Sequence, residues 1–493
     1  MTRLSATTID LFPPGIARPA YDRGAIATGV VHIGIGAFHR AHQAALFDAA
    51  LAAGDLRWGI IGASLRSPAV HDQMAPQDGL YSLVVRDGAA EDVRVIGAIR
   101  EVQVAPRDPA ALVAAMSAPG VHIVTLTVTE KGYKLDPATG ALLAGDDDVA
   151  ADLRDLAAPR TAPGFIVAAL ARRRAAGLAP FTAISCDNLP HNGSRLQAAV
   201  LAIAAQYDAS LADWIAQHGA FPETMVDRIV PATRDEDIAA LAARTGLEDQ
   251  AMVKTEPFSQ WVIEDRFAGE RPDFERFGAQ ITRSVAPWEE AKLRLLNGAH
   301  SGIAYLGGLA GVDFVHQFVG LAEGRGFVKA LWDEAAATLS PPPGLDIPAY
   351  RAALMARFAN SSLQHRTRQI AMDGSQKLPQ RLLAPIAARL DRGLPVEALA
   401  LAVAAWMRWQ GGRDDSGAIF TVDDPLAAVT AAKLAGAASP ADRVAALLAI
   451  EAIFPPRLAG DAGFRATLTR HLALLGEAGS RAAIASLLSK ERP

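Results

Sequence analysis

The stretch that decides the fold is Val30-Val-His-Ile-Gly34-Ile-Gly36-Ala-Phe38-His39-Arg40-Ala-His42-Gln43. It has the order of a short buried strand, a glycine turn and the start of a helix. A dinucleotide-binding βαβ unit needs this order, because glycines let the backbone approach a pyrophosphate at the helix N-terminus. His39 replaces the third glycine of the usual pattern, so a plain tight turn is the alternative interpretation. Arg40 favours the phosphate interpretation, since it would add a fixed positive charge to the first helical turn.

The next apolar stretch, 57–64, predicts a second strand, and Leu65-Arg66-Ser67 follows it. In a dinucleotide fold the residue at the end of this strand meets the adenosine ribose. An acid there favours NAD, whereas an arginine can accept a 2′-phosphate. Arg66 therefore leaves NADP open beside NAD. The alternative is an exposed arginine that contacts no ligand.

The stretches that follow extend the predicted sheet. The run 121–129 is rich in β-branched residues and predicts a central strand, and 180–186 predicts another. Two apolar stretches, 80–86 and 93–97, flank Asp87-Gly88 and predict a hairpin. Helical patterns separate the strands at 164–174, 193–205, 211–217 and 235–245. This alternation predicts a mostly parallel sheet with helices on its faces.

Polar residues follow two of the predicted strands. Lys131 comes shortly after 121–129, and Asn188 comes shortly after 180–186. Ligands of open α/β sheets bind beyond the carboxyl ends of the strands, which makes both residues candidate ligand contacts. Asn188 would donate a hydrogen bond to a substrate oxygen. A turn-forming role is the alternative for the polar residues at this strand end.

The pattern changes after Pro287. Strand signals fade there, and Ala/Leu-rich segments dominate as far as the C-terminus, interrupted by 340–344 and 454–456. We therefore predict two domains, an α/β domain over 1–286 and an all-α domain over 287–493. A chain of 493 residues is long enough for both cores.

The second domain begins with a predicted helix that contains Lys292-Leu-Arg-Leu-Leu-Asn297-Gly-Ala-His300. In an α-helix, at about 100° per residue, Asn297 lies roughly 140° around the axis from Lys292, and His300 falls between them. Arg294 points away from this side. An amine, an amide and an imidazole on one side suit proton transfer to or from a hydroxyl group. The alternative is an amphipathic helix whose polar residues face solvent.

The composition argues against several classes of function. The net charge of −5 offers no basic surface for nucleic acid. The single cysteine, Cys186, excludes an internal disulfide and fits a reducing compartment. The N-terminus lacks the apolar core of a secretory signal, and the longest apolar run, 398–407, has half the length of a membrane helix. We therefore expect a cytoplasmic protein that does not bind membranes.

Other kinds of chemistry lack support in the sequence. His39 and His42 could share a helical face, but no third ligand of suitable type is nearby, so we expect no metal site. The chain contains neither Gly-x-Ser-x-Gly nor the phosphate-binding Gly-x4-Gly-Lys-[Ser/Thr] motif. Acyl transfer and phosphoryl transfer are therefore not indicated.

Several motifs together resemble the polyol-specific long-chain dehydrogenase/reductase family, the mannitol dehydrogenase group. They are 34–43, 126–133, 185–188, 225–231, 261–265 and 292–300. The resemblance implies an N-terminal Rossmann-type domain, a helical C-terminal domain, and metal-free hydride transfer between a nicotinamide and the C2 position of a polyol or ketose. It also implies NAD as cofactor, with NADP still open, a small-molecule substrate, and a monomer or weak oligomer.

The resemblance assigns roles to residues at matching motif positions. Lys292 would be the general acid/base, Asn188 and Asn297 would hold the reacting oxygen, and His300 would bind substrate. Asp227 would support the site, and Glu289 would serve in proton relay. The expected cofactor contacts are Gly34, Gly36, Phe38 and Arg40.

Within this family the stretch 364–381 resembles the mannonate oxidoreductase (fructuronate reductase) branch, and Lys131 also favours that branch. A uronate substrate carries a carboxylate, and a charge-assisted partner contributes about 1.5–3 kcal/mol. The predicted partners are Lys131, Arg368 and Lys377. The alternatives are a mannitol/fructose or tagaturonate enzyme and, more remotely, a dinucleotide-binding sensor without catalysis.

Overall fold

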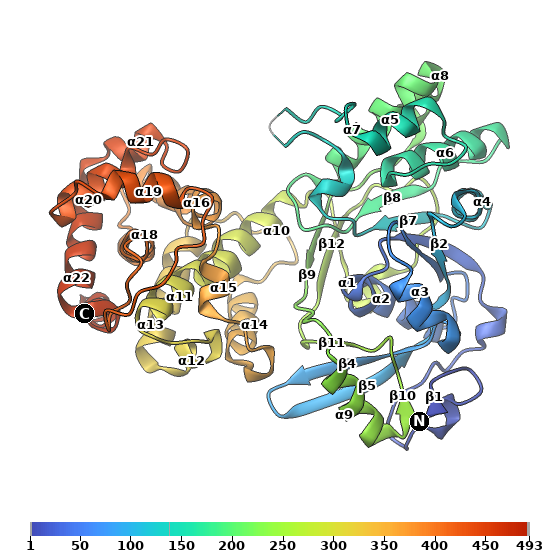
Figure 1. Cartoon of the computed structure of the whole chain (residues 1–493), viewed down its shortest axis with the longest axis horizontal. Coiled ribbons are helices and arrows are strands. Elements are labelled where there is room, and N and C mark those ends of the chain that lie inside the picture. The colour runs from blue at the N-terminus through green and yellow to red at the C-terminus, as the bar shows by residue number, and fades with distance from the viewer. Residues whose placement is uncertain (1, 138, 491–493) are drawn as a thin grey trace. The chain divides into compact units, whose positions relative to one another are not determined.

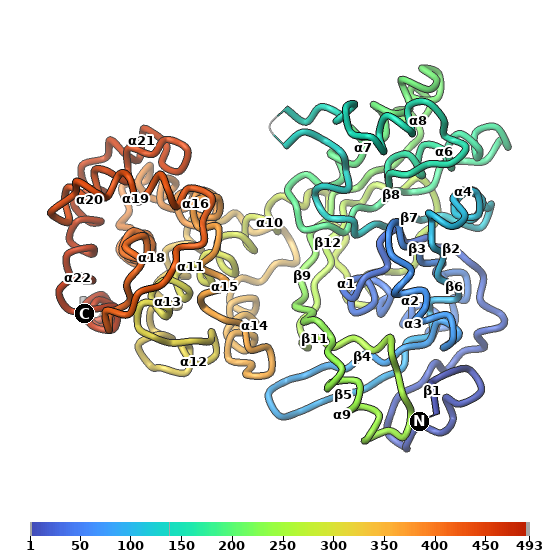
Figure 2. Tube along the Cα trace, viewed as in Figure 1, coloured from blue at the N-terminus to red at the C-terminus, as the bar shows by residue number. Residues whose placement is uncertain are grey.

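The computed structural model describes residues 2–137 and 139–490. It divides into two compact units, Met1–Val285 (unit 1) and Ala286–Pro493 (unit 2), drawn as a ribbon in Figure 1 and as a Cα tube in Figure 2. Unit 1 combines sheets with helices, whereas the named elements in the described part of unit 2 are all helices. The predicted fold class, an α/β domain followed by an all-α domain, is confirmed.

The main sheet of unit 1 has five strands in the order β6-β3-β2-β7-β8, and every neighbouring pair is parallel. The strands are β2 (Thr28–Ile33), β3 (Gly59–Ser64), β6 (Ile99–Val104), β7 (Ile123–Leu126) and β8 (Thr182–Ser185). The middle strand is therefore β2, and the 121–129 stretch supplies only the short β7 beside it. That stretch cannot remain a strand to its end, because Thr129 has a φ of 65°.

The inner strands β2 and β7 and the strand β8 are buried on both faces, which explains why they are mostly apolar, whereas the edge strand β6 has exposed polar residues. Val31 and Ile33 of β2 pack in one core cluster, and Val30 packs in the other, because alternate side chains face opposite sides. The first cluster includes side chains of α4 (Pro109–Ser117), α6 (Ala162–Ala175) and α7 (Asn192–Tyr207). The second includes side chains of α2 (Gln43–Ala52) and β12 (Gln260–Glu264).

The remaining strands of unit 1 form smaller sheets. The predicted hairpin is confirmed, with β4 (Tyr81–Asp87) antiparallel to β5 (Ala90–Ile96), and β11 (Val253–Thr255) runs parallel to β4. β12 pairs with β9 (Thr224–Asp227) and β13 (Gln280–Thr282), and β1 (Thr2–Arg3) pairs with β10 (Leu247–Glu248). The other α-helices are α1 (Ala37–Ala41), α3 (Ala69–Met74), α5 (Asp147–Arg154), α8 (Ala209–His218) and α9 (Asp235–Thr245).

Unit 2 is built around α18 (Glu397–Trp409), which packs against α11 (Gly298–Leu309) and α22 (Ala462–Lys490). The apolar run 398–407 is thus a core helix, and its side chains are buried. None of the helices in the described ranges is long and apolar enough to cross a membrane. The other helices are α10 (Ala286–Ala291), η6 (Lys292–Asn297), α12 (Val315–Gly320), α13 (Ala322–Ala336), α14 (Ile347–Ala359), η7 (Ser361–Leu363), α15 (Thr367–Ala371), α16 (Gly374–Leu378), η8 (Pro379–Leu383), α17 (Ala384–Leu390), α19 (Ala427–Leu434), α20 (Pro440–Leu448) and α21 (Pro456–Gly460).

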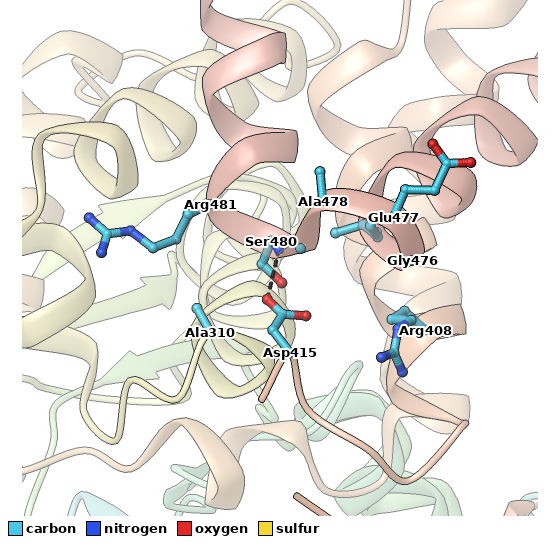
Figure 3. A pocket seen from close by; sticks show the side chains of 10 residues that line it. Ala310, Arg408, Asp415, Gly476, Glu477, Ala478, Ser480 and Arg481 are labelled. Atoms are coloured by element: carbon cyan, nitrogen blue, oxygen red, sulfur yellow. Dashed lines mark hydrogen bonds between the residues drawn. The ribbon is translucent and has the colours of Figure 1, made fainter. Parts of the chain in front are cut away.

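Helix α22 is kinked at Gly479, whose φ of 80° and ψ of 174° are not helical. The part of the helix after the kink is capped by Asp415, which accepts a hydrogen bond from the backbone N–H of Ser480 at 2.7 Å (Figure 3). A hollow of about 370 Å³ borders the kink, with Arg408 and Arg481 among its lining residues. The glycine has a structural reason here, because a positive φ disfavours residues with a Cβ.

Candidate active site

The carboxyl ends of β2, β3 and β7 border a cavity of about 900 Å³ in unit 1. Its lining includes the residues that follow these strands, namely Gly34 after β2, Ser64–Ser67 at the end of β3, and Thr127–Thr129 after β7. The N-terminal part of α6 closes another side of it. This edge of a parallel sheet is the place where ligands of such folds bind.

Glycine occupies the two positions of the turn for different structural reasons. Gly34 has a φ of +92°, and a Cβ built on it would lie 2.1 Å from the carbonyl oxygen of Thr127, so the fold itself requires glycine. Gly36 has an ordinary φ of −82°, and a Cβ there would meet nothing nearer than the Gly34 oxygen at 3.8 Å. Gly36 is exposed and precedes α1. The open space above it fits a ligand that approaches the backbone closely, as a dinucleotide pyrophosphate does.

Two of the predicted basic residues, Arg66 and Lys131, are exposed and line this cavity. Arg66 follows β3, where the sequence predicts the ribose contact. Lys134 also lines the cavity, but its charge is compensated by Asp146 at 2.7 Å and Asp148 at 3.4 Å. The positive charge that remains beside the cavity therefore comes from exposed side chains.

Arg40 has a different place from the one that the sequence predicts. Its side chain is only 6% exposed and does not line the cavity. The guanidinium donates to the carbonyl oxygen of Ala251, and the hydroxyl of Tyr81 donates to the Arg40 carbonyl oxygen at 2.6 Å. Burial lowers the pKa of Arg40. The geometry therefore supports a role in joining α1 to β4 and to the loop before β11, and it offers no support for a phosphate contact.

Phe38 also lies outside the cavity lining, and its ring stacks on His42 with the centroids 5.1 Å apart. His42 in turn bonds the carbonyl oxygen of Gln260 through Nε2 at 2.9 Å. His39 lies on the ring of His32 at 3.3 Å. These histidines are packed in the core, and no group of three or more potential metal ligands occurs in the part of the chain that the structure describes.

Asp187 is a residue that the sequence analysis did not select. Its buried carboxylate accepts hydrogen bonds from the backbone N–H groups of Val128 at 3.1 Å and Thr129 at 2.8 Å, and from the hydroxyl of Tyr133 at 2.8 Å. Burial raises the pKa of Asp187, and these bonds oppose the rise. Thr129, with φ 65° and ψ 166°, is in a conformation that costs a residue with a Cβ about 1–3 kcal/mol. Asp187 thus holds a strained backbone segment of the cavity wall.

Asn188 and Asp227 belong to the strand ends of unit 1. Asn188 is exposed and directly follows the anchored Asp187. Asp227 is buried at the end of β9, where it pairs with Gln260 of β12. The signal that would have found Asp187 is its position in the same Ser-Cys-Asp-Asn motif as Asn188.

Lys292–Asn297 is a π-helix rather than the predicted α-helix. Its hydrogen bonds span five residues instead of four, so the angle of roughly 140° expected from α-helical geometry does not apply. Residues five apart in a π-helix lie about one turn apart, so Lys292 and Asn297 lie nearer to the same side of the helix than they would in an α-helix. Short π-helical segments are rare and occur often at functional sites.

The side chains of this helix differ in burial. Lys292 and His300 are 7% and 8% exposed, while Asn297 and Glu289 are half-buried. The solvated alternative for this stretch is therefore wrong for its lysine and imidazole. Arg294 points elsewhere, as predicted, and donates to the carbonyl oxygen of Thr338 at 2.7 Å.

His300 lies among aromatic and basic side chains. Its ring centroid is 4.8 Å from that of Phe358 and 5.1 Å from that of His365. Burial lowers the pKa of His300 well below its usual value, and the neighbouring His365, Arg357 and Arg381 lower it further. The imidazole is therefore neutral at physiological pH and can both donate and accept a hydrogen bond.

The basic residues predicted for a substrate carboxylate have other neighbours in unit 2. Arg368 is exposed, with its guanidinium 5.4 Å from the ring centroid of Phe420. Lys377 is half-buried and donates to the carbonyl oxygen of Met372 at 2.5 Å, with Asp373 3.8 Å away. The positive charges that lower the pKa of His300 include Arg357 and Arg381 rather than either of these two residues.

Comparison with known proteins agrees with this arrangement. Residues 28–276 match the mannitol dehydrogenase Rossmann domain, and 284–475 match the mannitol dehydrogenase C-terminal domain. The chain is 42% identical to D-mannonate oxidoreductase of Escherichia coli K12 over 477 residues, which is 96% of this chain and 98% of that protein. It is 40% identical to mannitol 2-dehydrogenase of Phaeosphaeria nodorum over 474 residues, covering 95% and 82%.

A solved structure gives the same result. The mannitol 2-dehydrogenase of Pseudomonas fluorescens, in ternary complex with NAD and D-mannitol, superposes with a TM-score of 0.81 at 37% identity, covering 99% of this chain and 100% of that one. Both domain models together span most of the chain. The protein therefore belongs to the mannitol dehydrogenase family and is an oxidoreductase of that family.

Proposed function

We propose that the protein interconverts D-mannonate and D-fructuronate with NAD as cofactor. The observation that carries this choice of substrate is the positive charge around His300, where Arg357 and Arg381 both act on the imidazole. An anionic sugar acid gains from such surroundings, whereas a neutral hexitol or ketose does not. Similarity over almost the whole chain extends to D-mannonate oxidoreductase and, at nearly the same identity, to mannitol 2-dehydrogenase, so the choice rests on the charged side chains.

The cavity of unit 1 supplies the features that a dinucleotide needs. Gly34 and Gly36 let the backbone approach a pyrophosphate, and Arg66 lies at the strand end where the ribose is expected. A bound nicotinamide supplies the hydride that reduces the C2 carbon of the keto acid, or accepts it in the reverse direction. Asp187 keeps the Thr129 segment of the cavity wall in place.

Residues of unit 2 transfer the proton that accompanies the hydride. In reduction, Lys292 delivers a proton to the C2 oxygen, and Asn297 donates a hydrogen bond to the developing alkoxide, which is the role also proposed for Asn188. In oxidation, Lys292 accepts the hydroxyl proton, which requires an uncharged amine. Burial favours the uncharged amine. His300 orients a second substrate oxygen, Glu289 passes the proton to solvent, and Asp227 supports the site.

Steady-state rates test this proposal. We expect the highest kcat/KM for fructuronate with NADH, measured as loss of absorbance, against tagaturonate and fructose and against NADPH. Equal or higher kcat/KM for fructose would favour the mannitol/fructose pair instead. No oxidation of either reduced cofactor with any of these ketoses would favour the non-catalytic sensor.

A further inference from the structure

Arg381 lies next to the helix that carries Lys292. It belongs to η8, a second π-helix, and η8 packs against η6. The approach is close, because a Cβ built on Gly298 would lie 3.0 Å from the carbonyl oxygen of Arg381. Gly298 directly follows Asn297, so Arg381 is placed beside the predicted amine and amide.

The guanidinium of Arg381 makes few bonds for a partly buried group. Among the described residues its one hydrogen bond is to Oγ of Ser301, at 3.4 Å, and no carboxylate lies within 4.0 Å of it. Ser301 is the neighbour of His300 in sequence. An arginine has five N–H donors, so several donors of this half-buried guanidinium are left for solvent or for a ligand.

Two buried arginines of the chain, by contrast, satisfy more of their donors within the protein. Arg173 donates to the carbonyl oxygens of Ala179, Ala118 and Val121, at distances from 2.6 to 3.0 Å. Arg389 donates to the carbonyl oxygens of Pro395 and Glu334, at 2.6 and 3.1 Å. Arg381 thus makes one long bond within the protein, and its other donors are available to an acceptor that arrives from outside.

The charges around Arg381 also favour an anion. Burial lowers the pKa of Arg381 itself, and its charge lowers the pKa of His300 and of Lys377. Arg357 adds a second positive charge near His300. A carboxylate at this place would be attracted by both arginines.

We infer that Arg381 recognises the substrate carboxylate and makes the enzyme prefer sugar acids to neutral ketoses and hexitols. The inference rests on the proposed function and replaces Lys131, Arg368 and Lys377 as the carboxylate partner. In fructuronate the carboxylate and the reacting C2 carbonyl lie toward opposite ends of one six-carbon chain. Arg381 and the Lys292–Asn297 pair can therefore hold different ends of one molecule, with the planar guanidinium making two parallel bonds to the carboxylate.

The test compares two variants of Arg381 with a matched control. We expect Arg381→Met to lower kcat/KM for fructuronate by about tenfold to a hundredfold while leaving fructose reduction unchanged or faster. Arg381→Lys keeps the positive charge but loses the planar guanidinium, so it should retain part of the preference for fructuronate over fructose. Arg465→Met, at an exposed position of α22, should change neither rate. Thermal unfolding shows whether each variant is folded, and NADH binding, which depends on unit 1, should be the same in all of them.

The outcomes separate this inference from the function on which it rests. Equal losses for fructuronate and fructose in folded Arg381→Met, or an unchanged preference for the acid, overturn this inference alone. A wild-type protein that reduces none of these ketoses overturns the proposed function and the inference together. Fructose 6-phosphate is tested as a further substrate. A preference for it over fructuronate would overturn the inference and indicate that Arg381 recognises a phosphate.

Discussion

The glycine turn of unit 1 and the π-helix of unit 2 both depend on a close approach of backbones, but they build their sites differently. At Gly34 the backbone lies against the carbonyl group of Thr127, and backbone atoms shape the cavity beside it. At Gly298 the approach is to the Arg381 carbonyl, and the neighbouring site consists of buried ionisable side chains. Substitutions at the glycine turn should therefore act through the size of the added side chain. Substitutions at the π-helix should act through the charge that they remove.

The largest expected effect is the loss of the amine from the π-helix. Lys292→Ala should lower kcat by about 10²–10⁴-fold, the range that general acid–base catalysis contributes, and leave NADH affinity nearly unchanged. The two quantities are measured by steady-state kinetics and by fluorescence titration of NADH. A variant that keeps most of its kcat would remove Lys292 from this role.

A pair of glycine substitutions sharpens the description of the backbone site. Gly34→Ala should destabilise unit 1 by about 1–2 kcal/mol or more, because a positive φ and a backbone clash oppose the added Cβ. Gly36→Ala should leave the thermal midpoint unchanged and weaken NADH binding by about tenfold, since its Cβ enters only the space assigned to the ligand. Equal effects of the two changes on stability would contradict this distinction.

A smaller effect is expected at the ribose end of the cavity. Arg66→Asp should lower kcat/KM with NADPH by about tenfold, because an acid there repels a 2′-phosphate, and should affect NADH much less. Rates with both cofactors, at saturating fructuronate, give the ratio. An unchanged ratio would mean that Arg66 does not meet the ribose.

The smallest effect concerns pH. Burial holds the pKa of His300 well below its usual value, so the unfolded chain binds a proton there before the folded one does. This contribution to stability is complete above pH of about 6.5 and falls by up to about 1.4 kcal/mol per unit as the pH drops below it. His300→Gln should flatten the decline of the unfolding free energy between pH 7 and pH 5 in denaturant titrations. An identical slope in the variant would contradict the assignment.

Local signals account for the parts of the fold that were predicted from sequence. Strand 28–33, the hairpin at Gly88 and helices such as α9 follow from period, turn residues and caps that lie within a few residues of one another. The change to helices after 287 is also a local compositional change. The same is true of the strand-end positions of Lys131 and Asn188.

Distant contacts account for the parts that were not predicted. Arg40 was expected at a phosphate because it follows the glycine turn, but its bond to Ala251 joins residues far apart in the sequence. Asp187 was missed for the same kind of reason, since its partners Val128 and Thr129 lie on a different strand connection.

The sequence by itself determined the order of strands and helices, the two-part architecture and the membership of Lys292, Asn297 and His300 in one helical segment, because these depend on neighbours along the chain. Only the tertiary structure decided that this segment is a π-helix, that its lysine and histidine are buried, and that Arg381 stands beside them with few partners. Burial and uncompensated charge are properties of packing, and packing joins residues that no local pattern connects.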